Sequence, residues 1–239
     1  MDIFRDQLAW VYSIPFKHGK GAVHVDLGSG NHPRNPFKAS KLIATDHIHL
    51  FHSENNVQFL VQDLTKTLNF ADNSIDSFSA YDVLEHIPRW ERLNTDEIVF
   101  PFVNLMSEIF RCLTPGGLFL AITPSFPSGA AFQDPTHVNL ISRETVNYFA
   151  GPTFANELMY GFEYNFKIIY ENWTWAGLPY PEKFQEIETR LNKKTIKNYF
   201  HKLARRYEVI YVSYLWLKLS ILRKKNPTHL LWILQKPIS

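Results

Sequence analysis

Short apolar runs alternate with longer polar or amphipathic stretches through the first half of the chain. This alternation is typical of βαβ units, in which helices cover the faces of a parallel sheet. The runs predict strands at residues 22–27, 41–46, 57–61, 74–81 and 118–123. We therefore expect an α/β fold built around a mostly parallel, doubly wound sheet.

A long segment before the last of these strands has the pattern of a helix. It runs from Asn94 to Leu113, and Asn94 precedes Glu97 as in a capping box. Pro101 is expected to kink or restart this helix, because proline lacks the N–H that a helix interior needs. Pro115-Gly116-Gly117 is expected to end the helix and turn the chain into the next strand.

The second half opens with a loop rich in proline, glycine and phenylalanine at residues 124–137, followed by a short predicted helix at 142–150. Two further apolar runs, 162–173 and 230–234, predict the last strands. The segment 174–228 is expected to be a basic helical insertion between them. With 239 residues, the whole chain has the size of a single domain.

Charge is distributed unevenly, although the net charge is only +2. Residues 182–225 hold twelve lysines and arginines against four acids, and an apolar and aromatic run follows the most basic part. The interpretation we favour is an insertion that packs on the core or on a second subunit. The others are an interfacial helix on an anionic membrane and, without a recognisable module, an RNA-binding segment.

The cysteine content and the first residues of the sequence indicate the cellular compartment in which the protein is expected. The single Cys112 leaves no intramolecular disulfide, and no charged and apolar leader opens the sequence. We expect a cytoplasmic protein, at most peripheral to the inner face of the membrane. The ten histidines lack the spacing of a structural zinc site.

The strongest local signal is a strand that runs into a glycine turn, Val25-Asp26-Leu27-Gly28-Ser29-Gly30-Asn31. Glycines let a ligand approach the backbone, and an acid at a strand end accepts hydrogen bonds from amines or hydroxyls. Asp46 ends the second strand, where an acid would meet ribose hydroxyls. The pattern predicts a nucleoside site. A dinucleotide is disfavoured, because the third glycine is missing and His32-Pro33-Arg34-Asn35-Pro36 interrupts the helix start.

Through most of residues 20–140 these motifs, in this order, resemble those of the class I S-adenosylmethionine-dependent methyltransferases. Asp26 to Gly30 resembles the motif around the methionine part of the cofactor, and Gln62-Asp63-Leu64 resembles the loop that meets adenine. Phe70 to Ile87 is similar to the fourth-strand motif, and Leu113 to Gly117 to the turn before strand five. The resemblance implies cofactor-binding roles for Asp26, Gly28, Gly30, Asp46, Asp63, Leu64 and Tyr81.

The resemblance also implies seven strands, the last antiparallel, and methyl transfer from S-adenosylmethionine to an oxygen. The loop 132–138 resembles that of bacterial methyltransferases that accompany polysaccharide or O-antigen synthesis. The expected acceptor is therefore a hydroxyl of a saccharide or lipid-linked saccharide, and nucleic acid is not expected. His137 or His86 is the candidate base. In the alternative interpretation, His137 and Asp134 hold the loop together by a hydrogen bond.

Asp82, Glu85 and His86 would share one face of a helical turn, so with His137 they could hold Mg²⁺ or Mn²⁺. Some metal-assisted 2′-O-methyltransferases of small RNAs and some quinone O-methyltransferases are built similarly. We expect no metal here, with Glu85 and His86 simply bordering the pocket. Two other functions stay open. One is a metal-assisted RNA 2′-O-methyltransferase, and the other is a non-catalytic adaptor of this fold at membranes. Binding of the cofactor would distinguish an enzyme from the adaptor.

Overall fold

The computed structural model describes residues 21–48, 57–93, 97–150, 161–174 and 227–238. The chain divides into two compact units, residues 1–175 with 228–239 and residues 176–227. The second unit and the expected basic helix within it lie outside the described residues. The insertion within a single domain, and its membrane, partner and RNA interpretations, therefore stay predictions.

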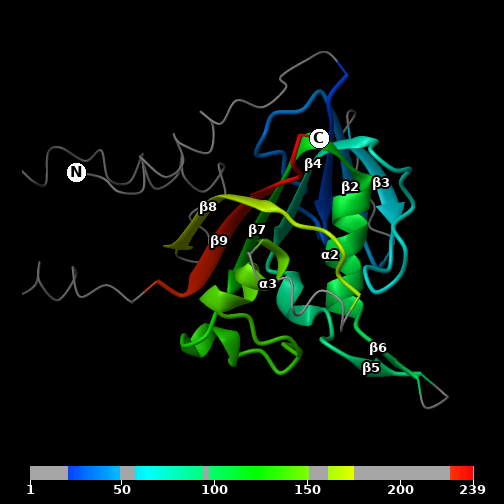
Figure 1. Cartoon of the computed structure of the whole chain (residues 1–239). Coiled ribbons are helices and arrows are strands. Elements are labelled where there is room, and N and C mark those ends of the chain that lie inside the picture. Colours follow the sequence, from blue (N-terminus) through cyan, green and yellow to red (C-terminus); the bar gives the residue numbers. More distant parts are fainter. Residues whose placement is uncertain (1–20, 49–56, 94–96, 151–160, 175–226, 239) are drawn as a thin grey trace, which may run out of the picture. The chain divides into compact units, whose positions relative to one another are not determined.

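Seven strands form one sheet in the order β3-β2-β1-β4-β7-β9-β8 (Figure 1). Neighbours from β3 to β7 are parallel, whereas β9 is antiparallel to both β7 and β8. The strands are β1 (Val23–Leu27), β2 (Lys41–Asp46), β3 (Val57–Val61), β4 (Ile75–Tyr81), β7 (Leu113–Pro124), β8 (Lys167–Thr174) and β9 (His229–Gln235). The predicted fold class is confirmed.

The strand order determines where a ligand binds. From β1 the chain first builds outward through β2 and β3, then returns to place β4 on the other side of β1. In an open parallel sheet, the loops after two strands diverge at such a reversal and leave a crevice beyond their carboxyl ends. The loops that follow β1 and β4 are therefore the expected walls of a site.

Helix α2 (Pro101–Cys112) is shorter than the sequence predicts. Residues 97–100 are not helical, and the short strand β6 (Ile98–Val99) pairs there with β5 (Glu91–Arg92). Pro101 is the first helical residue, because its fixed φ suits that position and its missing N–H needs no partner there. The prediction of a helix beginning at Asn94 was wrong for the described residues 97–100, and the restart at Pro101 is confirmed.

The predicted helical stretch at 142–150 is present in two short pieces. The 3-10 helix η3 (Arg143–Val146) leads into α3 (Asn147–Ala150), and Ser142 precedes them as the N-cap. The Ser142 N–H donates to Thr145 Oγ1 at 3.0 Å. Two further 3-10 turns, η1 (Leu84–His86) and η2 (Gly129–Ala131), lie in the loops beyond β4 and β7.

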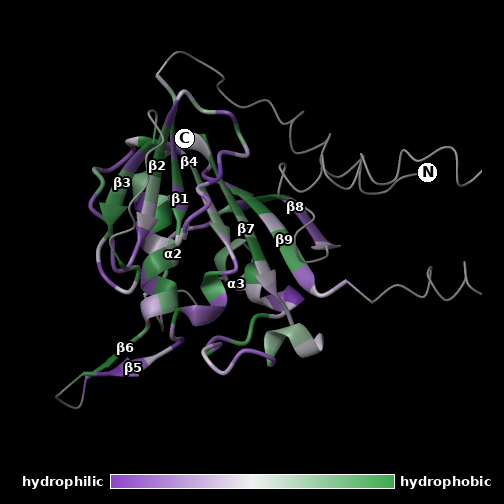
Figure 2. Ribbon diagram, turned by 180° about the vertical axis from the view of Figure 1, so that it is seen from behind, coloured by the Kyte–Doolittle hydropathy of each residue, from purple (hydrophilic) through white to green (hydrophobic). Residues whose placement is uncertain are grey.

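The two sheet faces differ in chemistry. One face carries the apolar core against α2 and α3, where Phe102 and Phe149 make an edge-to-face contact at 5.2 Å between ring centres (Figure 1). β7 and β9 are coloured largely hydrophobic in Figure 2. The alternate residues His24 and Asp26 of β1 are also fully buried, but outside this core cluster. They face a polar network described below.

Among the described helices, none has the length and apolar character needed to cross a bilayer.

Candidate active site

A cavity of about 540 Å³ opens beyond the carboxyl ends of the central strands. It is lined by Gly28, Asp46, His47, Gln62, Asp63, Leu64, Thr65, Asp82, Val83, His86, Ile87 and Thr136. These residues come from the loops after β1, β2, β3 and β4 and from the loop beyond β7. The cavity thus lies where the strand order predicts a ligand site.

The glycine turn after β1 forms one wall of this cavity. Gly28 has φ +58°, and a Cβ there would lie 2.3 Å from a methyl group of Val83. Gly30 has φ +54°, and a Cβ there would have no other atom within 4 Å. Left-handed backbone at two alternate positions keeps this turn tight and its backbone accessible. Gly28 is thus required both by its dihedral angle and by the close approach of the loop after β4.

Asp46 connects β2 to the glycine turn. Its Oδ2 accepts a hydrogen bond from the Gly30 N–H at 3.0 Å, and its Oδ1 accepts one from the His47 N–H at 2.8 Å. The Asp46 side chain is 13% exposed and lines the cavity. The exposed His47 ring also places Nδ1 2.8 Å from Oδ1. A carboxylate has about four acceptor sites, so Asp46 can still accept a bond from a hydroxyl such as that of a ribose.

The loop after β3 forms the opposite wall. Asp63 Oδ1 accepts hydrogen bonds from the N–H and hydroxyl of Thr65 at 2.9 and 2.7 Å. These bonds lower the pKa of Asp63, so its carboxylate is charged at neutral pH. Gln62 braces the loop by donating to the Asp63 and Thr67 carbonyls, while buried Leu64 supplies an apolar surface. The arrangement suits a flat base with an exocyclic amine.

Two predicted cofactor residues, Asp26 and Tyr81, are not among the residues that line the cavity. Asp26 Oδ2 accepts the Arg34 N–H at 2.8 Å, and the Arg34 guanidinium lies 4.6 Å from the ring centre of Tyr81. Both residues therefore hold the loop that follows the glycine turn. Their roles as cofactor ligands stay predictions.

Asp26 is also part of a buried polar chain on the second sheet face. Ser79 Oγ donates to Asp26 Oδ1 at 2.5 Å, and the His24 ring lies between Ser79 and Ser77 at 2.9 and 2.7 Å. All four side chains are fully buried. Burial raises the pKa of Asp26 to about 7 and lowers the pKa of His24 to about 3.

The Asp26 carboxyl should make stability depend on pH. Its folded-state pKa of about 7 exceeds the ordinary 3.8, so the folded protein binds a proton that the unfolded chain releases in between. This contribution is full below about pH 4 and is lost as pH rises through 7. Arg34 faces the carboxyl, and His24, linked through Ser79, is neutral over this range.

Asp26→Asn keeps the shape of this side chain and removes its titration. Between pH 5 and 8 the variant should lose less unfolding free energy than the wild type, by up to a few kcal/mol at about 1.4 kcal/mol per pKa unit. Urea unfolding at both pH values measures the difference. Parallel pH profiles for the two proteins would contradict the prediction.

Both candidate bases lie close together next to the cavity. His86 lines it, and the His86 and His137 rings meet edge to face with centres 4.9 Å apart. His137 Nδ1 lies 3.2 Å from the Ala131 carbonyl oxygen, and His86 Nδ1 lies 3.2 Å from the Thr136 carbonyl oxygen. A carbonyl only accepts, so Nδ1 carries the hydrogen and Nε2 keeps the lone pair in each neutral ring.

Glu85, which sequence reasoning treated as a border residue, lies at the centre of this group. Its side chain is buried, its Oε2 accepts from Thr123 Oγ1 at 3.0 Å, and its Oε1 lies 4.0 Å from His137 Nε2. Burial raises the pKa of Glu85 to about 8. Its main-chain carbonyl accepts from Val138 and Asn139, which fixes the loop beyond β7 onto η1.

Asp82 does not join this group. Its backbone is left-handed, with φ +54°, and its Oδ1 lies 3.2 Å from His229 Nε2. Asp134 Oδ1 accepts from the Thr136 N–H and hydroxyl, while the His137 main-chain N–H donates to the Asp134 carbonyl at 3.2 Å. The loop is thus held by Asp134 and Thr136, and the His137 imidazole is directed elsewhere.

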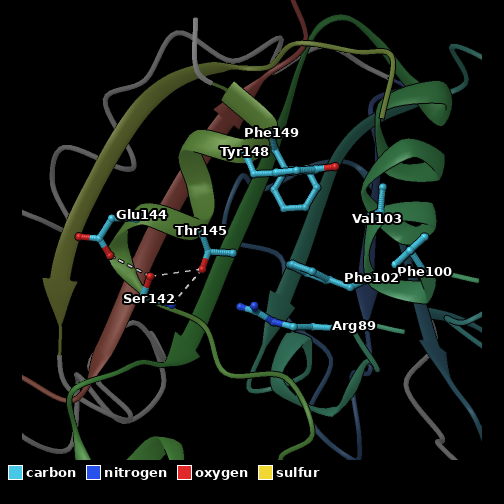
Figure 3. A pocket seen from close by; sticks show the side chains of 9 residues that line it. All are labelled: Arg89, Phe100, Phe102, Val103, Ser142, Glu144, Thr145, Tyr148 and Phe149. Atoms are coloured by element: carbon cyan, nitrogen blue, oxygen red, sulfur yellow. Dashed lines mark hydrogen bonds between the residues drawn. The ribbon is translucent and has the colours of Figure 1, made fainter. Parts of the chain in front are cut away.

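A second cavity, of about 420 Å³, lies between the start of α2 and the η3–α3 segment (Figure 3). Aromatic side chains of Phe100, Phe102, Tyr148 and Phe149 dominate its lining. The Arg89 side chain reaches it and donates to Asn139 Oδ1 at 2.7 Å. No motif in the sequence signals this cavity, because its walls come from segments that are distant along the chain.

Comparisons with known proteins agree with the fold. Residues 38–121 match the sequence model of the methyltransferase domain. No curated protein is similar enough in sequence to match the chain.

Two solved structures share the fold at low sequence identity. A chain from the complex of the Haloferax volcanii Trm112 methyltransferase activator with a methyltransferase is 13% identical, with a TM-score of 0.52 over 98% of this chain and 92% of that one. A methyltransferase from Bacillus halodurans is 16% identical, with a TM-score of 0.50 over 97% and 99% of the two chains.

The sheet order, the glycine turn and the acid at the end of β2 define the class I methyltransferase fold. With the match of residues 38–121 to the methyltransferase domain, they indicate an S-adenosylmethionine-dependent methyltransferase. S-adenosylmethionine is the cofactor that such a domain uses. It supplies a methyl group already activated on a sulfonium centre.

Proposed function

We propose that the protein transfers the methyl group to a hydroxyl of a saccharide or of a lipid-linked saccharide. The observation that carries this proposal is the position of the two imidazoles. His86 lines the cofactor cavity, and His137 lies directly beside it with its Nδ1 against the Ala131 carbonyl oxygen. A hydroxyl loses a proton when its oxygen is methylated, and a neutral imidazole is suited to accept that proton.

The reaction needs little covalent chemistry from the protein. The acceptor oxygen attacks the methyl carbon, the carbon–sulfur bond breaks, and S-adenosylhomocysteine leaves with the electron pair of that bond. The hydroxyl proton passes to His137 or His86. Most of the acceleration is expected from holding acceptor and methyl group in line, which Gly28, Asp46 and Asp63 support by holding the cofactor.

The loop that follows β7 supports the assignment of a saccharide as the methyl acceptor. Phe126 and Phe132 are 53% and 55% exposed, and their ring centres are 6.4 Å apart. Exposed aromatic rings offer apolar faces against which the C–H face of a sugar ring can pack. The same loop carries the segment 132–138 that resembles those of polysaccharide-associated methyltransferases.

Calorimetric titration of S-adenosylmethionine and S-adenosylhomocysteine, followed by an acceptor screen, tests the proposal. We expect binding in the micromolar range, about −8 kcal/mol. Nucleotide-linked and lipid-linked sugars should accept a methyl group from labelled cofactor, with mass spectrometry locating it on an oxygen. Methylation of RNA in place of every sugar tested would contradict the saccharide assignment.

Asp46→Ala should weaken cofactor binding about 10- to 100-fold. Hydrogen bonds to a charged group contribute about 1.5–3 kcal/mol, and the substitution also releases the Gly30 N–H. Asp72→Ala is the matched control, because Asp72 is an exposed acid paired with Arg111 away from the cavity. Calorimetry should give equal affinities for the control and the wild type. An unchanged affinity in Asp46→Ala would remove Asp46 from the cofactor site.

A further inference from the structure

The gap between Glu85 and His137 has an unusual width. Glu85 Oε1 is buried, and among the described residues it has no hydrogen-bond partner. Its neighbour His137 Nε2 lies at 4.0 Å, which is too long for a direct hydrogen bond of about 2.7–3.2 Å. The same distance is short for a water bridging two such bonds. A buried oxygen without a partner is costly for the folded protein, and an occupant of this gap would remove that cost.

The surrounding side chains converge on that gap. Glu85, His86 and His137 each offer one ligand atom, and these atoms lie within 4.8 Å of one another. Two donors bound to one ion at about 2.1 Å can lie up to roughly 4.2 Å apart. The 4.0 Å separation of Glu85 Oε1 and His137 Nε2 already fits such an ion. The three atoms lie only within 4.8 Å of one another, so one side chain would have to move toward the ion for all three to bind it.

The hydrogen bonds behind the two histidines prepare them as ligands. Each Nδ1 lies 3.2 Å from a main-chain carbonyl oxygen, Ala131 for His137 and Thr136 for His86. This arrangement fixes the ring orientation and directs Nε2 away from the carbonyl, as at metal sites where the second ring nitrogen donates to a carbonyl. Glu85 is braced in the same way, since Thr123 binds its other carboxylate oxygen.

We propose that Glu85, His86 and His137 bind a divalent transition-metal cation next to the cofactor cavity. The ligand set is two imidazoles and one carboxylate, without Asp82, whose Oδ1 faces His229 at 3.2 Å. Two nitrogens and one oxygen favour Zn²⁺, Co²⁺, Fe²⁺ or Mn²⁺ over Mg²⁺, which prefers oxygen ligands in an octahedron. Three protein ligands leave coordination positions for a further molecule.

The cation would deepen the proposed function, on which this part of the inference rests. The cation would bind the imidazole lone pairs that a general base needs. One ring therefore cannot be a metal ligand and a general base at the same time. A cation next to the methyl donor polarises a bound hydroxyl and lowers its pKa, which replaces the base. The binding of the metal itself does not depend on any acceptor.

The decisive experiment uses the full chain, stripped with chelator, and titrates Co²⁺ and Zn²⁺ alone. Wild type should bind one equivalent, with visible Co²⁺ absorption bands of a nitrogen-containing site that Zn²⁺ then displaces. Glu85→Gln and His137→Ala should each weaken binding at least about 100-fold, because even partners behind a ligand contribute 10- to 100-fold. Glu85→Gln keeps an acceptor for Thr123, so the fold is preserved.

Two controls test the ligand set. Asp82→Asn removes a carboxylate from the same cavity, and His32→Ala removes an exposed histidine outside its lining, and both should bind Co²⁺ as the wild type does. No stoichiometric binding by the wild type overturns the proposal. Binding that survives in Glu85→Gln, or that is lost in Asp82→Asn, overturns it as well.

Cofactor calorimetry on the same stripped protein separates this proposal from the proposed function. Normal cofactor binding and sugar methylation without any metal effect would sustain the methyltransferase assignment and confine the cation to a structural role. Failure to methylate any saccharide, with stoichiometric Co²⁺ binding intact, would contradict only the proposed function.

Discussion

His137→Ala should slow methyl transfer about 100- to 10,000-fold while leaving cofactor affinity within about twofold of the wild type. Proton transfer by a positioned side chain contributes a factor of this size. His137 lies beside the cavity, and neither ring nitrogen lines it, so the cofactor loses no contact. Single-turnover kinetics with a confirmed sugar acceptor measures the rate, and calorimetry measures the affinity.

Two measurements separate the roles that His137 can have. Free imidazole added to His137→Ala should restore part of the rate if the lost group is a base. Added Zn²⁺ or Co²⁺ should change the wild-type rate if the lost group is a ligand. Full activity of His137→Ala without additions would exclude His137 both as the base and as a ligand that the reaction needs, and would leave His86 as the candidate base.

Gly28→Ala should destabilise the protein by about 2–5 kcal/mol and abolish measurable cofactor binding. A left-handed residue other than glycine costs roughly 1–2 kcal/mol, and Gly28 has φ +58°. The added methyl would also lie 2.3 Å from Val83 Cγ2, an overlap that typically adds about 1–3 kcal/mol. Val83 is β-branched and does not easily rotate away. Urea unfolding measures the loss.

Gly30→Ala is the matched comparison, since Gly30 has φ +54° but no atom within 4 Å of the added methyl. It should cost only the dihedral part, about 1 kcal/mol. The double variant Gly28→Ala with Val83→Ala should recover the steric part of the loss relative to Val83→Ala alone. Equal stability of the Gly28 and Gly30 variants would show that the contact with Val83 yields without cost.

Local patterns were sufficient for most of the strands. The apolar runs at β1, β2 and β3 were predicted to the residue or within one residue, because short apolar segments bounded by turn residues are typical of strands. β7 was predicted too short, since its first residues contain proline and glycine and lack a strand pattern. Those residues are extended because Leu113 pairs with Ile75 of β4, and Gly116 and Gly117 share main-chain hydrogen bonds with Lys236, which follows β9.

The helix before β7 shows that a local capping pattern can predict the wrong helix start. Asn94 and Glu97 form a good local capping pattern, yet Glu97 precedes a two-residue strand that pairs with Glu91–Arg92. A local capping pattern is a weak preference that a tertiary contact can override. Pro101 was the stronger signal, because its ring excludes the helix interior whatever the surroundings.

The sequence by itself determined the order of the elements, the glycine turn and the acid at the end of β2, because backbone sterics and strand ends act over a few residues. Only the tertiary structure decided what each acid contacts: Asp26 binds Ser79 and the Arg34 N–H outside the cavity lining, whereas Asp82 lines the cavity and faces His229. It likewise brought Glu85 and His137 to 4.0 Å, although they are 52 positions apart along the chain. Side-chain direction and hydrogen-bond partners depend on neighbours that fold from distant segments, and no local pattern encodes them.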